Sequence, residues 1–365
     1  MEPKRGYLCG AMEARPALSS RPVAIWVMAG VFMLIIQVLL GGITRLTGSG
    51  LSITEWKPIL GAIPPMDEAS WLKAFDQYKQ IGQFKQLNAH FTLSDFKFIY
   101  FWEWFHRLWA RLIAVAFAIP FLIFLVQRRF RREMISPLLI LFGLGALQGL
   151  LGWLMVKSGL NEENVYVNHI RLAIHFIAAM VLVVYAWWFG LRLLVPSSGY
   201  TKAPALRKFT FLLLAVLTLQ LIYGAFMAGL KAAVFAPTWP LINGGIWPAG
   251  MNSGKGMADL INNPITVQFI HRGLAYLLTI LIVIWDQKAR VVRPASNLFR
   301  ASRFIPLLVV IVQVTLGVFT VLYSPDRQLL LAIGVAHQFT GMLLLLVLVW
   351  ELLLLTPRSY ASTPD

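Results

Sequence analysis

The sequence has almost no cysteine and few charged residues. Cys9 is the single cysteine, which excludes an intramolecular disulfide, a cysteine-based zinc site and an iron–sulfur cluster held by this chain alone. Any redox cofactor must therefore be bound by other side chains. Charged residues make up 13% of the 365 residues, whereas 58% are hydrophobic and the mean hydropathy is +0.69. This composition lies far outside the range of soluble globular domains.

Acidic residues are also scarce, with 16 Asp and Glu against 32 Lys and Arg. A net charge of +16 would suit nucleic acid, but membrane proteins collect Lys and Arg in their cytoplasmic loops, so we expect no nucleic-acid partner. The first twenty residues have no apolar core and contain Glu2 and Glu13. They resemble neither a signal peptide nor an Arg-rich transit peptide. We therefore expect a bacterial inner membrane protein rather than an imported organellar one.

Long hydrophobic runs are abundant, and eight of them reach the length of about 20 residues that crosses a bilayer core. We predict an all-α membrane protein with eight transmembrane helices in contact with membrane lipids. The predicted helices cover residues 24–46, 98–126, 135–156, 170–194, 208–230, 265–286, 304–323 and 329–355.

Basic residues concentrate in alternate loops, which indicates how the chain is oriented. They lie before the first predicted helix and after the second, fourth and sixth, as in Arg5, Arg129, Lys202 and Arg290. By the positive-inside rule, both termini are cytoplasmic. The segments 47–97 and 231–264 then become long outer loops. The tryptophans and mixed charges of the first suggest an amphipathic lid at the outer surface, either a lipid-facing cover or a substrate gate.

An internal repeat relates the two halves of the chain. The four odd-numbered helices share a glutamine followed four residues later by glycine, and the four even-numbered helices each carry one histidine near the outer end. The pairs are Gln37 with Gly41, Gln148 with Gly152, Gln220 with Gly224, and Gln313 with Gly317; the histidines are His106, His175, His271 and His337. Ordinary helix packing could explain one such pair, but four copies at one depth favour a shared cofactor environment.

The repeat predicts two four-helix bundles of the same orientation, because four crossings return the chain to its starting side. The predicted segments are a cytoplasmic tail at 1–23, an N-terminal half at 24–194, a cytoplasmic linker at 195–207, a C-terminal half at 208–355 and a cytoplasmic tail at 356–365.

The histidines point to haem. A histidine inside a membrane span is costly and is usually functional, and without cysteine, imidazole is the natural ligand for a redox metal. An iron porphyrin between facing helices needs one or two imidazoles, whereas mononuclear zinc or copper needs three or four ligands. We predict that His106 pairs with His175 and His271 with His337, toward the periplasmic side. His90 and His169, in or beside outer loops, are expected to be surface or interfacial residues.

Glycines and arginines beside these histidines suit the same cofactor. Gly224 and Gly317 would let the flat macrocycle approach the helix backbone, and the glutamines could donate hydrogen bonds to its edge. Arg107 and Arg272 each follow a histidine and are candidates for the haem propionates, with snorkelling toward lipid headgroups as the alternative. Further candidates are Arg45 and Arg111.

One difference between the halves suggests chemistry. Glu103 stands three residues before His106, whereas Gln268 occupies the equivalent place before His271. A buried carboxylate can move protons or stabilise positive charge at a reacting carbon, which an amide cannot do as an acid or base. We therefore expect substrate chemistry in the first half and a resident electron-transfer haem in the second. Alternatively, Glu103 complements the helix dipole or pairs with Arg107.

Several motifs resemble the haem A synthase family, in particular its alphaproteobacterial and mitochondrial branch. They are QVLLGGITRLTGSGLSITEWKPILGAIPP (Gln37 to Pro65), FKFIYFWEWFHRLWAR (Phe96 to Arg111), MVKSGL with HIRLAIHF (Met155 to Phe176), and QFIHR with AHQFTGM (Gln268 to Met342). The resemblance covers essentially the whole membrane domain. Another branch of the family has cysteine pairs in its outer loops, which this chain lacks, so no redox role of such cysteines applies to it.

The resemblance implies an oxidoreductase. Its substrate would be haem O, whose C8 methyl group is oxidised through a hydroxylated intermediate to the formyl group of haem A for cytochrome oxidase. His106 and His175 would flank the substrate with Glu103 as the reactive carboxylate, while His271 and His337 would ligate a haem b cofactor. The implied partners are haem O synthase, cytochrome oxidase assembly factors and an unidentified electron-transfer partner. The sequence leaves the oligomeric state open, with a homo-oligomer as one alternative.

Two other classes use similar residues. A di-haem b electron carrier or quinol dehydrogenase would use the same four histidines without altering either haem, and only the difference between Glu103 and Gln268 speaks against it. A haem or small-molecule transporter is disfavoured by the parallel repeat and by the lack of helices broken by Pro and Gly in the inverted-repeat manner.

Overall fold

The protein is an all-α, multi-pass membrane protein, as predicted. The computed structural model describes residues 21–57 and 60–356, and within these residues it contains helices and no β-strand beyond one isolated bridge, Ile242 with Gly245. Eight helical segments are long and apolar enough to cross a membrane. Their helices are α1 (Arg21–Leu46), α3 (Leu93–Val126), α4 (Arg132–Lys157), α5 (His169–Leu194), α6 (Pro204–Gly229), α8 (Pro264–Arg290), α10 (Ile305–Leu322) with the short α9 (Asn297–Ser302) before it, and α11 (Arg327–Leu354).

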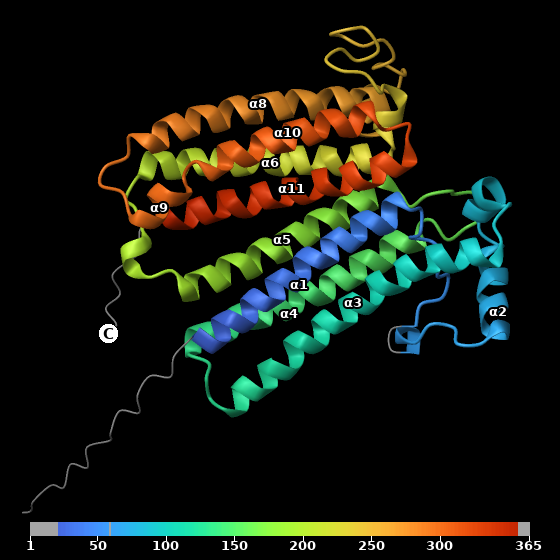
Figure 1. Cartoon of the computed structure of the whole chain (residues 1–365), viewed down its shortest axis with the longest axis horizontal. Helices are drawn as coiled ribbons and strands as arrows, with labels where there is room; N and C mark the ends of the chain where they lie inside the picture. The colour runs from blue at the N-terminus through green and yellow to red at the C-terminus, as the bar shows by residue number, and fades with distance from the viewer. Residues whose placement is uncertain (1–20, 58–59, 357–365) are drawn as a thin grey trace, which may run out of the picture.

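The helices lie in two groups that follow the order of the chain (Figure 1). In one group α1 packs against α3 and α5, and α4 packs against α5; in the other, α6 packs against α8 and α11, and α10 against α8 and α11. The groups meet where α5 contacts α6 and where α1 contacts α11. That these groups are two copies of one bundle remains a prediction, and so do the segment boundaries derived from it.

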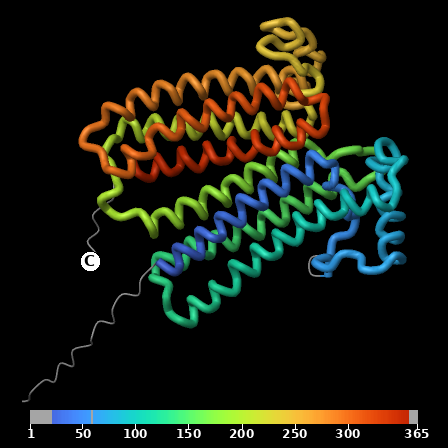
Figure 2. The backbone as a smooth tube through the Cα atoms, in the orientation of Figure 1, coloured from blue at the N-terminus to red at the C-terminus, as the bar shows by residue number. Residues whose placement is uncertain are grey.

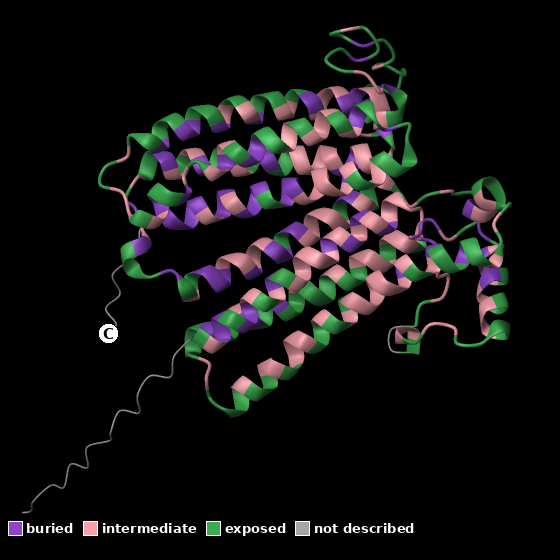
Figure 3. Ribbon diagram, viewed as in Figure 1, coloured by how far each residue is buried: buried purple, intermediate pink, exposed green. Residues whose placement is uncertain are grey.

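Helix α11 is central and helix α3 is peripheral. Buried residues run along most of α11, from Gly334 to Leu354, whereas α3 buries Phe96, Ile99 and Glu103 alone. Figure 3 shows the same contrast, with much of α3 half-buried or exposed. Because lipid replaces water around a membrane helix, exposed apolar side chains on α3 are the expected lipid-facing surface.

The predicted helix boundaries are correct to within a few residues, and the largest difference has a local cause. Helix α3 begins at Leu93 instead of residue 98, because Thr92 and Asp95 form a capping box that satisfies the first backbone N–H groups. Helix α6 begins at Pro204, four residues before the predicted start, and the fixed φ of this proline suits the first helical turn. Most of the predicted tails at 1–23 and 356–365 lies outside the described residues.

The two long loops lie at the same end of the helices (Figure 2). The loop between α1 and α3 contains α2 (Glu68–Tyr78), whose apolar side chains pack on the protein. Phe75 and Tyr78 are buried against Phe96, and the ring of Trp71 lies edge-on to that of Tyr100 with centroids 5.0 Å apart. The apolar face of this predicted lid is therefore used to attach the loop to the start of α3.

Candidate functional site

The four intramembrane histidines line one cavity. It has a volume of about 1540 Å³ and reaches into both helix groups. Pockets for a single small ligand are typically about 300–1,000 Å³, so this cavity is large enough for more than one. Its wall includes His106, His175, His271 and His337. The sequence pattern thus identifies side chains that share one internal space.

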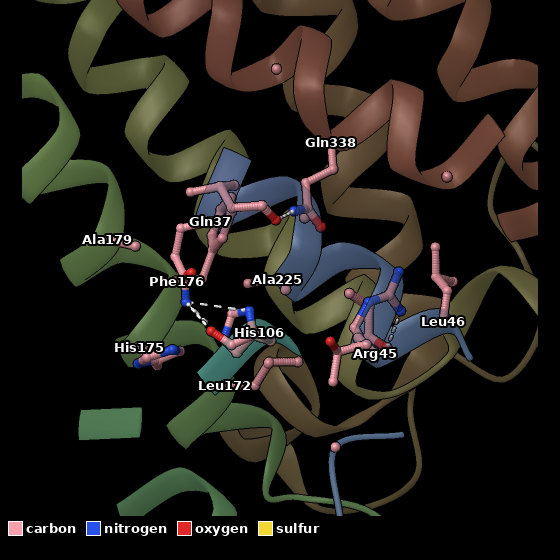
Figure 4. Close-up of a pocket in the computed structure, with 18 of the residues that line it drawn as sticks. Gln37, Arg45, Leu46, His106, Leu172, His175, Phe176, Ala179, Ala225 and Gln338 are labelled. Carbon is pink, nitrogen blue, oxygen red and sulfur yellow. Dashed lines mark hydrogen bonds between the residues drawn. The ribbon is translucent and has the colours of Figure 1, made fainter. Parts of the chain in front are cut away.

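Each histidine has a glutamine from a neighbouring helix as its partner. The contacts from glutamine Nε2 to histidine Nε2 are 3.2 Å for Gln37 and His106, 3.4 Å for Gln148 and His175, 3.4 Å for Gln220 and His271, and 3.5 Å for Gln313 and His337. Figure 4 shows the first of these, with Gln37 reaching His106 near His175 at the cavity wall. The repeated glutamine therefore lies beside one histidine in each of the four motifs.

The glycine of each motif makes room for the same imidazole. A Cβ atom on Gly41 would lie 3.3 Å from Cε1 of His106, and a Cβ on Gly224 equally 3.3 Å from Cε1 of His271. At the other two positions the approach is closer, 2.9 Å from Gly152 to His175 and 3.0 Å from Gly317 to His337. In both halves the first glycine is the more distant from its histidine and the second is the closer. This shared order supports the predicted parallel repeat.

His271 and His337 are spaced like the two axial ligands of a haem. Their ring centroids are 6.4 Å apart and their planes differ by 78°. A metal-bound imidazole nitrogen lies about 2 Å from the metal, which puts the centroids of two axial rings about 6 Å apart. His337 Nδ1 lies 3.1 Å from the Gln313 carbonyl, and a ligating histidine commonly donates its second N–H in this way. The pair therefore fits an iron porphyrin.

The remaining histidines lie elsewhere. His90 is exposed and contacts Phe91, while His169 Nε2 lies 3.0 Å from the Ile261 carbonyl oxygen, and neither lines the cavity. In residues 21–57 and 60–356, no three His, Cys, Asp or Glu side chains come together as a metal site. The described geometry therefore offers paired imidazoles as ligands.

Glu103 lies at the cavity and is fixed to the first outer loop. The side chain is 3% exposed, and its Oε2 accepts hydrogen bonds from Ser52 Oγ at 2.7 Å and from the Ile53 backbone N–H at 2.8 Å. Its Oε1 forms an ion pair with Arg107 at 2.6 Å. The pairing considered as an alternative to chemistry is thus present, and Glu103 also lines the same space as His106.

Gln268 binds the second outer loop as a hydrogen-bond donor, whereas Glu103 binds the first outer loop as an acceptor. Its Nε2 donates to the Ala236 carbonyl at 2.9 Å, and its buried Oε1 has no hydrogen-bond partner among the described residues. At the equivalent position Glu103 accepts from the Ile53 N–H. Sequence reasoning missed this loop-fastening role, although a polar residue at the same place in both copies is its signal.

The two arginines that follow histidines also hold these loops. Arg107 donates to the Ile53 carbonyl at 3.1 Å, and Arg272 donates to the Thr238 carbonyl at 2.6 Å. Both guanidinium groups line the cavity, so loop attachment does not remove them from it. Their proposed role toward propionates remains a prediction.

Gln338 connects the two helix groups beside the histidines, a contact that sequence reasoning missed. It follows His337, and its Nε2 donates to the Val38 carbonyl on α1 at 2.9 Å (Figure 4). The corresponding residue after His175 is Phe176, which packs in an apolar cluster with Ala225. Gln338 lies outside the repeated motif, so no repeat signal marks it.

Comparison with known proteins agrees with this geometry. Residues 24–349 match the model of the COX15-CtaA family, described as cytochrome oxidase assembly protein. This match covers well over half of the chain, including all four cavity histidines. The chain belongs to this family.

Similar proteins named Heme A synthase match this chain over nearly its whole length. One from Flavobacterium psychrophilum is 40% identical, over 90% of this chain and 96% of its own length. A second, from Novosphingobium aromaticivorans, is 40% identical over 95% of this chain and 100% of its own length. A third, from Rhodopseudomonas palustris, is 40% identical over 98% of this chain and 96% of its own length.

Proposed function

We propose that the chain is a haem A synthase, an oxidoreductase that converts the C8 methyl group of haem O through a hydroxylated intermediate to the formyl group of haem A. The observation that carries this proposal is the pair of unlike histidine sites in one cavity. One site has a buried carboxylate, Glu103, in the cavity wall, whereas an amide, Gln268, takes the equivalent sequence position in the other half and is fully buried outside that wall. The names of the relatives and the cytochrome oxidase assembly family agree with this function.

The first half would bind the substrate. His106 and His175 are the ligands available to the iron of haem O. Oxidising a methyl carbon removes electrons and protons from it, and a carboxylate in a water-poor site stabilises the positive charge that develops there. Glu103 would supply this carboxylate, and Ser52, Ile53 and Arg107 hold it in one orientation.

The second half would hold a haem b cofactor. His271 and His337 would be its axial ligands, and a haem with two imidazole ligands supplies one-electron transfer. Arg272, Gly224 and Gly317 line this site, whereas Gln268 does not line it and bonds to the second outer loop.

We further propose that the histidine end of the helices faces the periplasm of a bacterial inner membrane. The opposite end carries Arg128, Arg129, Arg131 and Arg132 between α3 and α4, and Lys288 and Arg290 at the end of α8. Short basic loops remain on the cytoplasmic side during insertion. Haem O synthase and cytochrome oxidase assembly factors would then exchange haem with the chain within or at the outer side of this membrane.

Porphyrin extraction from the purified protein tests the function. The protein is expressed together with haem O synthase, and its porphyrins are extracted and separated by chromatography. We expect haem b together with haem O, the hydroxylated intermediate and haem A. Recovery of haem b alone, with no haem A formed in the cells, would mean that the chain is an electron carrier and not a synthase.

The glycines of the second half give a graded prediction. A Cβ atom on Gly317 would meet His337 at 3.0 Å, whereas a Cβ on Gly224 would meet His271 at 3.3 Å. The replacement Gly317→Ala should therefore shift the optical and electron paramagnetic resonance spectra of haem b more than Gly224→Ala does. Equal spectra in both variants, or a larger shift in Gly224→Ala, would show that these glycines do not set the imidazole positions.

A further inference from the structure

A groove between α3 and α4 continues from the histidines of the first half. Its walls are formed by small residues, Ala110 and Ala114 on α3 and Gly145, Ala146 and Gly149 on α4, all of which line the cavity. These five residues are exposed, and a Cβ atom added at Gly145 or Gly149 would meet no atom within 4 Å. None of the five carries a charge, and Arg111, which also lines the cavity from α3, donates to the Lys57 carbonyl in the first outer loop. The five residues thus form an apolar stretch with room between its walls.

The groove has a defined length. Gly152, which contacts His175, marks the histidine level on α4. At the other end the ring of Phe142 packs against those of Phe117 and Phe121, with centroids 4.6 and 5.1 Å apart. The rise of 1.5 Å per residue places these two levels about 15 Å apart along the helix. The space is therefore long and narrow, and it begins at the proposed substrate site.

The second half has a narrower space at this level, because larger side chains occupy the places of Gly145 and Gly149 on α10. Counted from Gln313 as Gly145 and Gly149 are counted from Gln148, the corresponding residues are Val310 and Val314. Val310 is 2% exposed and Val314 packs against the main hydrophobic core. In agreement, α8 packs against α10, whereas α3 and α4 make few contacts with each other.

We propose that this groove binds the isoprenoid tail of haem O. The proposal rests on the proposed function, in which the first half takes haem O and the second takes haem b. Haem O carries a long, branched, farnesyl-derived chain that haem b lacks, so the half with the groove is the half whose ligand has a tail. The groove is apolar along its length and joins the space beside His106 and His175, as an attached tail requires.

The groove orients the substrate more than it adds affinity. Lipid chains are as apolar as the groove, so moving the tail from the bilayer into it gains little from the hydrophobic effect. A tail held in one direction, however, prevents the macrocycle from rotating about the axis through its iron. The groove thereby determines which methyl group lies beside Glu103, and it acts as a specificity determinant for the oxidised carbon.

A double variant that copies the second half tests this proposal. Gly145→Val combined with Gly149→Val narrows the groove, and the protein is purified from cells that make haem O. We expect the amount of haem O plus its oxidised products, relative to haem b, to fall by about tenfold, since small changes in pocket volume have effects of this size. The haem b content should not change, because its ligands lie in the other half, and this content also reports that the variant folds.

Gly143→Val is the matched control. Gly143 lies on the same helix, and a Cβ atom there also meets nothing within 4 Å, but Gly143 does not line the cavity. This variant should keep the porphyrin composition of the unaltered protein. If the double variant loses haem b, Ala114→Leu narrows the groove from the α3 wall and replaces it in the test.

A competition experiment separates the tail from the macrocycle. Purified protein is offered equal amounts of haem O and of tail-less protohaem, and the bound porphyrins are measured. The unaltered protein should accept haem O and protohaem in the first half alike, whereas the narrowed variants should favour protohaem, because their valine side chains exclude the tail. Retention of haem O at the unaltered ratio by the narrowed variants would overturn the proposal and leave the groove to lipid chains. If even the unaltered protein holds neither haem O nor haem A, the proposed function fails together with it.

Discussion

Replacing Glu103 by glutamine should lower haem A formation by about 100-fold or more, the lower end of the range for a lost acid–base group. The substitution keeps the size of the side chain and removes its charge. The haem b spectrum should remain, because Glu103 contacts the first outer loop and Arg107 and not the second pair of histidines. Haem A formation in membranes and the reduced-minus-oxidised spectrum of the purified protein measure the two effects.

The structure adds a structural explanation that this experiment must separate from the chemical one. Glu103 anchors Ser52 and Ile53, so the glutamine variant also weakens the attachment of the loop. The control is Ser52→Ala, which removes the hydroxyl that donates to Glu103 and leaves the carboxylate in place. We expect the control to retain most activity. A loss in Ser52→Ala as large as that in Glu103→Gln would assign Glu103 to loop attachment alone.

The eight spans could be predicted from the sequence because the bilayer imposes a length and a composition on each of them. The depth of the histidines followed from the same spans, since helical rise converts sequence position directly into position along the membrane normal. His106 and His175, placed on separate predicted helices, therefore come to one cavity as expected. Their glutamine partners were found as well, because Gln37 and Gln148 repeat at the same depth.

Contacts between segments far apart in the chain could not be predicted in this way. Gln338 reaches the Val38 carbonyl on a helix 300 residues away in the chain, and nothing in the local pattern of either segment indicates that α1 and α11 are neighbours. The loop attachments are similar, because Ile53 presents an N–H to Glu103 where Ala236 presents a carbonyl to Gln268. The sequence does not show whether a loop will present an N–H or a carbonyl group. The reason for a carboxylate at Glu103 and an amide at Gln268 therefore becomes clear only from the folded loops.

The roles assigned to the glycines changed with the structure for a related reason. In the sequence, Gly224 and Gly317 indicate a close approach by something flat, which the macrocycle would satisfy. In the structure the imidazoles of His271 and His337 make that approach. Gly145 and Gly149, which belong to no repeated motif, are the glycines beside open space. A glycine thus marks a close approach or an opening, and the helix that lies opposite decides between them.

Replacing His271 or His337 by alanine should deplete the resident haem b by about tenfold or more, because loss even of a group that merely orients a metal ligand typically costs 10–100-fold in affinity. The ring centroids lie 6.4 Å apart with the planes at 78°, so removal of either ring would leave the proposed haem iron with one imidazole. The haem content per protein and the low-spin signal in electron paramagnetic resonance measure the loss.

His106→Ala is the matched control, since it removes from the first half an imidazole that also lies beside a glutamine and a glycine, Gln37 and Gly41. It should keep haem b and lose haem A formation. Full haem b occupancy with unchanged spectra in the His271 or His337 variants would contradict the assignment of haem b to the second half. Loss of haem b in His106→Ala would mean that the resident cofactor lies in the first half.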